Sequence, residues 1–148
     1  MPLAKFSIED LLPHRNSMLL IEEILEGGPN AAVSSAVVNK NWPLFDGSRV
    51  NSLILIEVAA QTAGIWAGWA RIQERGLESD KKSWLVGIKR ADFFVDALNL
   101  NDRIVTHAVN SFKYEGYRQI TATARVGSEV VGEIELQAIQ ADDDLLRE

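Results

Sequence analysis

The sequence predicts an α+β fold in which a curled antiparallel β-sheet wraps around one long central helix. Residues 53–70 read LILIEVAAQTAGIWAGWA, an almost wholly apolar run of helical length that has to be buried on nearly all sides. Residues 119–126 and 130–139 alternate between apolar and polar side chains, which is typical of antiparallel strands with one buried face. The concave face of a curled sheet is the place where such a helix can be covered.

Small side chains within this apolar run favour the same arrangement, because they let a sheet approach the helix backbone closely. They are Ala59, Ala60, Ala63, Gly64, Ala67 and Gly68. A curled antiparallel sheet around one central helix is the hotdog fold. A membrane span is the competing interpretation, since about 20 apolar residues cross a bilayer. Glu57 and Gln61 argue against it, because a carboxylate near the bilayer centre costs about 2.5–3.5 kcal/mol.

Capping and turn residues predict the elements around the long helix. Ser7 is a plausible N-cap for a short helix at 8–12, which Pro13 helps to end. Residues 18–26 fit a strand or a helix, and the turn that follows would allow a hairpin with a strand at 31–38. Residues 39–52 are predicted to form a long irregular loop, the kind of loop that often carries function.

The second half of the chain is predicted to consist mainly of strands. The long helix is expected to start at Ser52 as its N-cap and to stop at Gly76. A charged loop follows, and the tail at 142–148 is expected to fray. The predicted strands lie at 84–88, 91–95, 104–112, 119–126 and 130–139, with turns at 99–102, 116 and 127–128.

Composition limits the classes of function. A chain of 148 residues is about one domain, so we expect a single domain over 1–148. Without cysteine there is no disulfide scaffold, thiolate metal site or cysteine nucleophile, and the presence of only two histidines argues against a multi-histidine zinc site. A net charge of −6 argues against nucleic acid as the main partner. Residues 1–10 lack the apolar core of a secretory signal, so a cytoplasmic location is expected.

Glu57 is the residue that points most directly to chemistry. It lies in the first turns of an apolar helix, where burial favours the protonated form and the helix N-terminus favours the anion. Opposed influences of this kind allow a carboxyl group both to give and to take a proton. Gln61 follows at i+4 on the same helix face, where it can hydrogen-bond Glu57 or line a shared pocket.

Other candidates are less specific. His14 lies in LLPHRNS and can act as a base or simply hydrogen-bond the backbone, and His107 is expected to be a surface residue in a strand. The loop at 40–47, with two aromatic side chains, can wall an apolar pocket. Lys89 and Arg90 form a basic pair in an acidic chain, and can meet an anionic partner or remain an ordinary solvated pair.

Three stretches of the chain resemble the 3-hydroxyacyl-[acyl-carrier-protein] dehydratases of the hotdog superfamily. LLPHRNSMLLIEEIL, at 11–25, resembles the opening of that family. LILIEVAAQTAGI, at 53–65, resembles its central helix, with an acid four residues before a glutamine. LVGIKRADFFVDALNLNDRI, at 85–104, resembles a strand and the turn that follows it. Taken together and in this order, the three stretches most resemble the divergent branch of the family that is associated with aryl-polyene-type biosynthesis.

This resemblance implies roles for several residues. In the family, a loop histidine removes the C2 proton of a 3-hydroxyacyl thioester, and the helix acid protonates the departing hydroxyl; the acid corresponds to Glu57 and the glutamine to Gln61. A backbone N–H at the helix start polarises the thioester carbonyl and corresponds to Ser52. By the Pro-x-Phe spacing that ends at Phe45, Trp42 stands where the family has its histidine, and tryptophan can only donate a hydrogen bond.

The missing histidine leaves three interpretations open. Another base can replace it, with His14 and Asp46 as candidates, since general-base catalysis contributes about 10²–10⁴-fold. Glu57 can instead activate water alone, as in a hotdog thioesterase. Alternatively, the chain binds an acyl thioester without converting it, or supports an active homologue in a mixed dimer.

The resemblance also implies partners. The substrate is carried on phosphopantetheine, by acyl carrier protein or coenzyme A, and the reaction needs no other cofactor and no metal. Lys89 and Arg90 are candidates for contact with the carrier or its phosphate. The fold is expected to form at least a dimer, as a homo-oligomer or as a hetero-dimer with a related dehydratase, with no nucleic acid and no membrane span.

Overall fold

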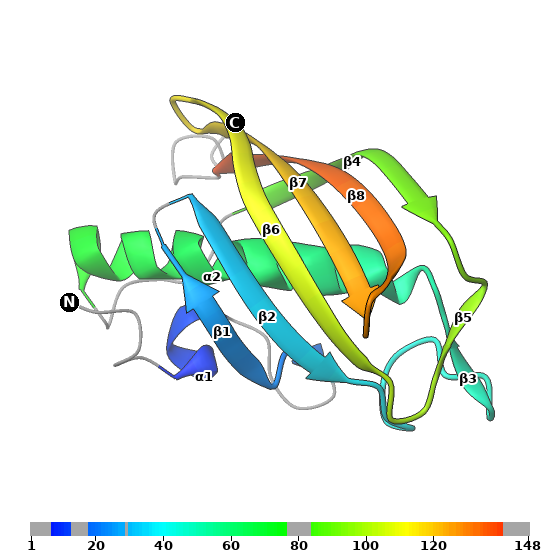
Figure 1. Cartoon of the computed structure of the whole chain (residues 1–148). Helices are drawn as coiled ribbons and strands as arrows, with labels where there is room; N and C mark the ends of the chain where they lie inside the picture. Colours follow the sequence, from blue (N-terminus) through cyan, green and yellow to red (C-terminus); the bar gives the residue numbers. More distant parts are fainter. Residues whose placement is uncertain (1–6, 13–17, 29, 77–83, 141–148) are drawn as a thin grey trace.

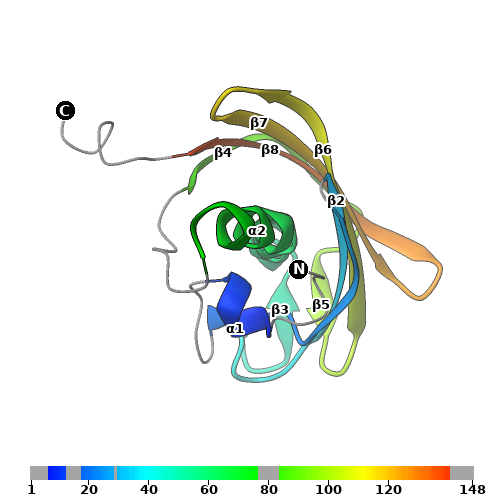
Figure 2. The ribbon, with the colours of Figure 1, turned by 90° about the vertical axis from the view of Figure 1, so that its left-hand side faces the viewer.

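The computed structural model describes residues 7–12, 18–28, 30–76 and 84–140. Within these residues, a curled sheet wraps around one long helix (Figures 1 and 2). Six strands form an antiparallel sheet in the order β1-β2-β6-β7-β8-β4. They are β1 (Glu23–Gly27), β2 (Ala31–Val37), β4 (Trp84–Phe93), β6 (Arg103–Tyr114), β7 (Tyr117–Val126) and β8 (Glu129–Gln140). The hotdog fold predicted from the sequence is therefore confirmed.

The central helix α2 (Ile54–Arg75) lies along the concave face of this sheet. No helix in the described ranges is long and apolar enough to cross a membrane. Residues 18–26, which were ambiguous from periodicity, contribute β1 and its hairpin with β2. The strands expected at 84–88 and 91–95 form one strand, β4, whose register shifts between Ile88 and Arg90. The expected tail lies outside the described residues.

A second, two-stranded sheet includes part of the loop at 39–52 that was predicted to be irregular. It pairs β3 (Arg49–Asn51) with β5 (Ala97–Asn99), and Val50 lies opposite Leu98. Both of these side chains are fully buried. The two strands are three residues long and far apart in sequence, so neither shows a local alternating pattern.

The start of α2 differs from the prediction that Ser52 is its cap. The N-cap is Leu53, without a side-chain capping hydrogen bond, and Asn51 Oδ1 accepts the Leu53 N–H at 2.9 Å. Ser52 is buried and its carbonyl accepts the Leu55 N–H at 3.0 Å. The tight turn between β3 and α2 turns the Ser52 side chain inward, so the preceding asparagine provides the hydrogen bond instead. Gly76 ends the helix as predicted.

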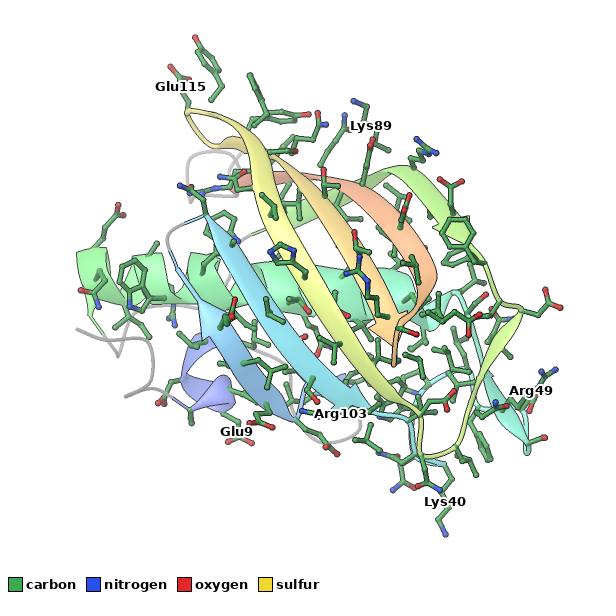
Figure 3. All side chains as sticks on the ribbon, viewed as in Figure 1. Glu9, Lys40, Arg49, Lys89, Arg103 and Glu115 are labelled. Atoms are coloured by element: carbon green, nitrogen blue, oxygen red, sulfur yellow. The ribbon has the colours of Figure 1, made fainter. Side chains whose placement is uncertain are left out.

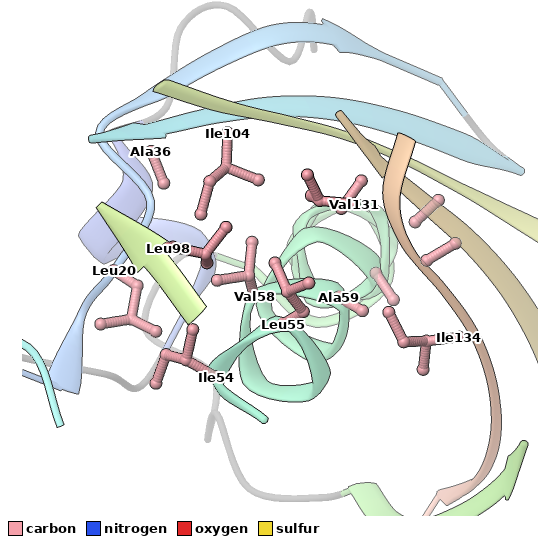
Figure 4. Packing of buried hydrophobic residues seen from close by; sticks show 14 of the residues in the cluster. Leu20, Ala36, Ile54, Leu55, Val58, Ala59, Leu98, Ile104, Val131 and Ile134 are labelled. Carbon is pink, nitrogen blue, oxygen red and sulfur yellow. The ribbon is translucent and has the colours of Figure 1, made fainter. Parts of the chain in front are cut away.

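The main core lies between α2 and the sheet. Leu55, Val58 and Ala59 of the helix face Ile104 of β6 and Ile134 of β8, and all five are almost completely buried (Figure 4). Full burial of each larger side chain in this set, such as Leu55 or Ile104, contributes about 1.5–3 kcal/mol to the stability of the fold. This packing fixes the rotation of α2, and thereby decides which of its residues face away from the sheet.

A second cluster joins α2 to the short helix α1 (Ile8–Leu11). A Cβ atom on Gly68 would overlap the Leu11 carbonyl oxygen, and one on Gly64 would lie 2.7 Å from Leu12 Cδ2. The expectation that all the small residues of this helix serve the sheet is therefore only partly right. Ala59 and Ala63 pack within the sheet-side core, whereas the two glycines allow α1 and Leu12 to approach.

Candidate active site

Gln61 is the centre of a hydrogen-bonded group on the side of α2 that faces away from the sheet. Its side chain is completely buried. Gln61 Nε2 donates to the Met18 carbonyl at 2.7 Å and to Glu57 Oε1 at 3.0 Å, and Gln61 Oε1 accepts the Leu20 N–H at 3.0 Å. Both donors of the amide have an acceptor, so its orientation is fixed by its partners.

Glu57 lies in the first turn of α2 and is half-buried. The hydrogen bond from Gln61 confirms the pairing that the i+4 spacing predicted. Because Gln61 is also tied to the backbone of Met18 and Leu20, the position of the Glu57 carboxyl group depends on a segment about 40 residues away. Sequence reasoning did not identify Met18 and Leu20, since they contribute backbone atoms, which leave no signal in residue type.

Trp42 is placed in the main hydrophobic core, with 5% of its surface exposed. Its backbone N–H donates to the Asn39 carbonyl at 3.2 Å in a turn. Phe45 is half-buried against the same core and forms an isolated bridge with Val50. The two aromatic residues of this loop therefore pack inward and hold the loop against the start of α2.

Asp46 is exposed and stabilises a turn. Its Oδ1 accepts the backbone N–H groups of Arg49 at 2.8 Å and Ser48 at 2.9 Å. These hydrogen bonds, that from Arg49 first, hold the pKa of Asp46 below its usual value. A carboxylate stabilised in this way is a weaker base than an ordinary aspartate, which argues against Asp46 as a replacement for the missing histidine.

The backbone N–H of Ser52 donates to the Asp96 carbonyl at 3.1 Å, in the connection between β4 and β5. This amide, which the resemblance implies as the donor to a thioester carbonyl, is thus occupied within the chain. His14 lies outside the described residues. His107 is exposed on β6, as expected of a surface residue in a strand.

Lys89 and Arg90 lie on β4, and Figure 3 shows Lys89 pointing away from α2. Lys89 Nζ donates to Gln119 Oε1 at 3.4 Å. Ile120, the next residue of β7, faces inward, so the Gln119 side chain faces outward. The contact between Lys89 and Gln119 therefore lies on the convex face of the sheet. Arg90 Nε pairs with Asp92 Oδ2 at 2.6 Å, with 63% of the arginine side chain exposed. The basic pair and Glu57 therefore lie on opposite sides of the sheet within one chain.

The described residues contain no group of three or more His, Cys, Asp or Glu side chains that could hold a metal ion. Among the described residues discussed above, the groups that can do chemistry are a carboxyl group and an amide that orients it. Such a set can transfer a proton to or from a bound molecule or activate water. Of the described residues joined by these hydrogen bonds, namely Met18, Leu20, Glu57 and Gln61, the glutamate is the titratable one.

Comparisons with known proteins agree with the geometry. The chain is 32% identical over 142 residues to the 3-hydroxyacyl-[acyl-carrier-protein] dehydratase FabZ of Anaeromyxobacter sp. (strain K), covering 91% of this chain and 88% of the relative. The FabZ of Chlamydia pneumoniae is 30% identical over 145 residues, covering 91% and 90%.

Solved structures share the fold. The dehydratase heterocomplex ApeI:P from Xenorhabdus doucetiae matches with a TM-score of 0.82 at 21% identity, covering 96% of this chain and 95% of that one. A hypothetical thioesterase with coenzyme A from Streptococcus pneumoniae matches with a TM-score of 0.59 at 12% identity, over 80% and 84%. Residues 6–147 match the family model described as ApeP-like, ApeP dehydratase. The chain therefore belongs to the ApeP-like dehydratase family, with the hotdog fold.

Proposed function

We propose that this chain takes part in the dehydration of a 3-hydroxyacyl thioester carried on a phosphopantetheine arm, with Glu57 as the proton donor. The reaction removes a proton from C2 and the hydroxyl group from C3 as water, and leaves a C2–C3 double bond. The observation that carries the proposal is the hydrogen bond from Gln61 Nε2 to Glu57 Oε1. The FabZ relatives, which are 3-hydroxyacyl-[acyl-carrier-protein] dehydratases, support the choice of an acyl thioester on a carrier protein.

The hydrogen bond matters because it restrains Glu57 Oε1 and so limits the positions that the carboxyl group can take. Gln61 is buried and has its own partners in Met18 and Leu20, so it holds its position without the substrate. A general acid held in this way needs little reorganisation when the hydroxyl group departs. The half-buried state of Glu57 allows contact with a bound molecule.

The base is the part of the reaction that the described residues leave open. Trp42 is packed in the core and has no basic lone pair, and Asp46 is tied to its turn. We propose that the C2 proton is taken by a histidine of a second, related hotdog chain in a mixed dimer. The Xenorhabdus structure is that of a dehydratase heterocomplex, which supports this choice. His14 of the same chain is the alternative base.

The edge strand β4 supports a dimer, because it exposes an apolar side chain. Strand β4 pairs with β8 along its other side and exposes 55% of Ile88, although Ile88 lies opposite the buried Leu136. A second chain that pairs along β4 would cover Ile88.

The test is mass spectrometry of a 3-hydroxyacyl carrier protein after incubation with the chain alone, and with the chain plus a related hotdog subunit that has the histidine. We expect loss of one water from the acyl group in the mixed sample only. Glu57→Ala should abolish that loss while the mixed dimer still forms, whereas Glu133→Ala, on the exposed face of β8, should leave it unchanged.

Other results would overturn parts of the proposal. Dehydration by the chain alone that His14→Ala removes would assign the base to His14 instead of a partner. Release of the whole acyl group would identify a thioesterase, which needs one carboxylate and a water. Dehydration that continues in a mixed dimer with Glu57→Ala would refute the role of Glu57.

A further inference from the structure

We infer that one ordered water molecule is bound inside the fold, between Thr106 of β6 and Ser34 of β2, on the sheet side of α2. This site is separate from the Glu57–Gln61 group and does not depend on the proposed function. It rests on three buried hydroxyl groups, those of Ser34, Thr62 and Thr106, which have 0%, 0% and 1% of their surface exposed.

Two of the hydroxyl groups have defined hydrogen-bond directions. Thr62 Oγ1 donates its only hydrogen to the Val58 carbonyl at 2.7 Å. It lies 2.8 Å from Ser34 Oγ, so in this contact Thr62 accepts and Ser34 donates. Ser34 Oγ has then used its hydrogen and keeps lone pairs that can accept a further bond.

The third hydroxyl group is not satisfied by these partners. Thr106 Oγ1 is buried and makes no hydrogen bond within the described part of the chain. Thr106 lies directly opposite Ser34 in the pairing of β2 with β6, so their Cβ atoms are about 4.5–5.5 Å apart on the same face. Thr106 thus has an unused donor, and Ser34 an unused acceptor, on the same face of two paired strands, and a water molecule that hydrogen-bonds both would satisfy them.

On the inner face of the sheet, the strand neighbours of Thr106 and Ser34 include several small side chains. Thr106 pairs with Ala124 on its other side. The buried alanines around the pair are Ala32, Ala36, Ala108, Ala122 and Ala124. Buried waters occur where otherwise unsatisfied polar groups have room, and typically make about three hydrogen bonds. A water here would join β2 and β6 at the point where Ser34 contacts α2.

The sign of a melting-temperature shift tests the inference. Thr106→Val keeps the shape of the side chain and removes the hydroxyl group. If a water bridges Thr106 and Ser34, the variant loses its hydrogen bonds and the Tm falls by about 2–4 °C. If the site is dry, the variant removes an unsatisfied buried hydroxyl and the Tm rises. Thr123→Val, on the opposite face of β7, is the control for the replacement itself.

A direct measurement accompanies this test. We expect a nuclear Overhauser effect between a long-lived water and the amides of Thr106 or Ser34 in the wild-type chain, kept in Thr106→Ser and lost in Thr106→Val. A Tm that rises in Thr106→Val relative to Thr123→Val overturns the inference. So does the absence of this water signal from the wild-type chain.

Discussion

Gln61 and Thr62 are neighbours in sequence, and both are completely buried polar residues, but they serve opposite sides of α2. Gln61 faces away from the sheet, joins the Met18–Leu20 backbone and holds the Glu57 carboxyl group. Thr62 faces the sheet and hydrogen-bonds Ser34 and the Val58 carbonyl. One group includes a half-buried acid, whereas the other consists of hydroxyl groups within the core.

Burial alone therefore does not distinguish the two groups. Among the described residues, Gln61 hydrogen-bonds a titratable side chain, Glu57, whereas Thr62 hydrogen-bonds a hydroxyl group and a backbone carbonyl. We call the face with Glu57, Gln61, Gly64 and Gly68 the Glu57 side of α2, and the face with Val58 and Thr62 the sheet side. Changes to the two sides should have different effects.

The largest effect is expected from Gln61→Glu. This change replaces two donated hydrogen bonds with an acceptor and places a carboxylate beside Glu57. Leaving a buried charge without a partner costs about 3–5 kcal/mol, and the unfolding free energy in urea should fall by this amount. Gln137→Glu, on the outer face of β8, should change it by less than about 0.5 kcal/mol. Equal effects of the two changes would refute the role of the Gln61 contacts.

A smaller effect is expected from Gly68→Ala, since the new Cβ would overlap the Leu11 carbonyl oxygen and displace α1. We expect a loss of about 1–3 kcal/mol in chemical unfolding, despite the higher helix propensity of alanine. Among the described residues, the new Cβ of Gly64→Ala meets Leu12 Cδ2, at the end of a flexible side chain, and this change should cost less. A larger loss of stability from Gly64→Ala than from Gly68→Ala would contradict this packing of α1 on α2.

On the sheet side, Thr62→Val should lower stability by about 1–2 kcal/mol, because Ser34 loses its buried acceptor. Dehydration activity should persist in the folded variant, since Glu57 and Gln61 keep their contacts. Thermal unfolding and the mass-spectrometric assay together check this separation. A loss of activity as complete as that of Glu57→Ala, in a variant that is folded, would show that the two sides are not independent.

The smallest effect is expected from Asp46→Ala. Its pKa is lowered in the folded chain, so the carboxylate stabilises the turn above the pKa of the unfolded chain and loses this effect as the pH falls through the folded value. The difference in Tm between wild type and variant should therefore be small at pH 7 and disappear in strong acid. Activity at pH 7 should not change, and a large loss would reinstate Asp46 as a base.

Much of the fold could be predicted because it depends on local patterns. The alternation in β7 and β8 and the apolar run of α2 place these elements close to their observed bounds. Strands β3 and β5 could not be predicted, since each is stabilised by the other across nearly 50 residues. The Ser52 cap was wrong for a related reason: the turn that buries Ser52 is set by β3 and by its hydrogen bond to Asp96.

By itself, the sequence determined that a carboxyl group would lie near the start of a buried helix with a glutamine one turn later, because helical periodicity puts residues i and i+4 on one face. Only the tertiary structure decided what that face meets. The rotation of α2 against the sheet turns Gln61 to Met18 and Leu20 and turns Thr62 to Ser34. These contacts join residues that are distant in sequence, and several of them involve backbone atoms. The identity of a residue does not indicate such partners, because every residue has a similar backbone.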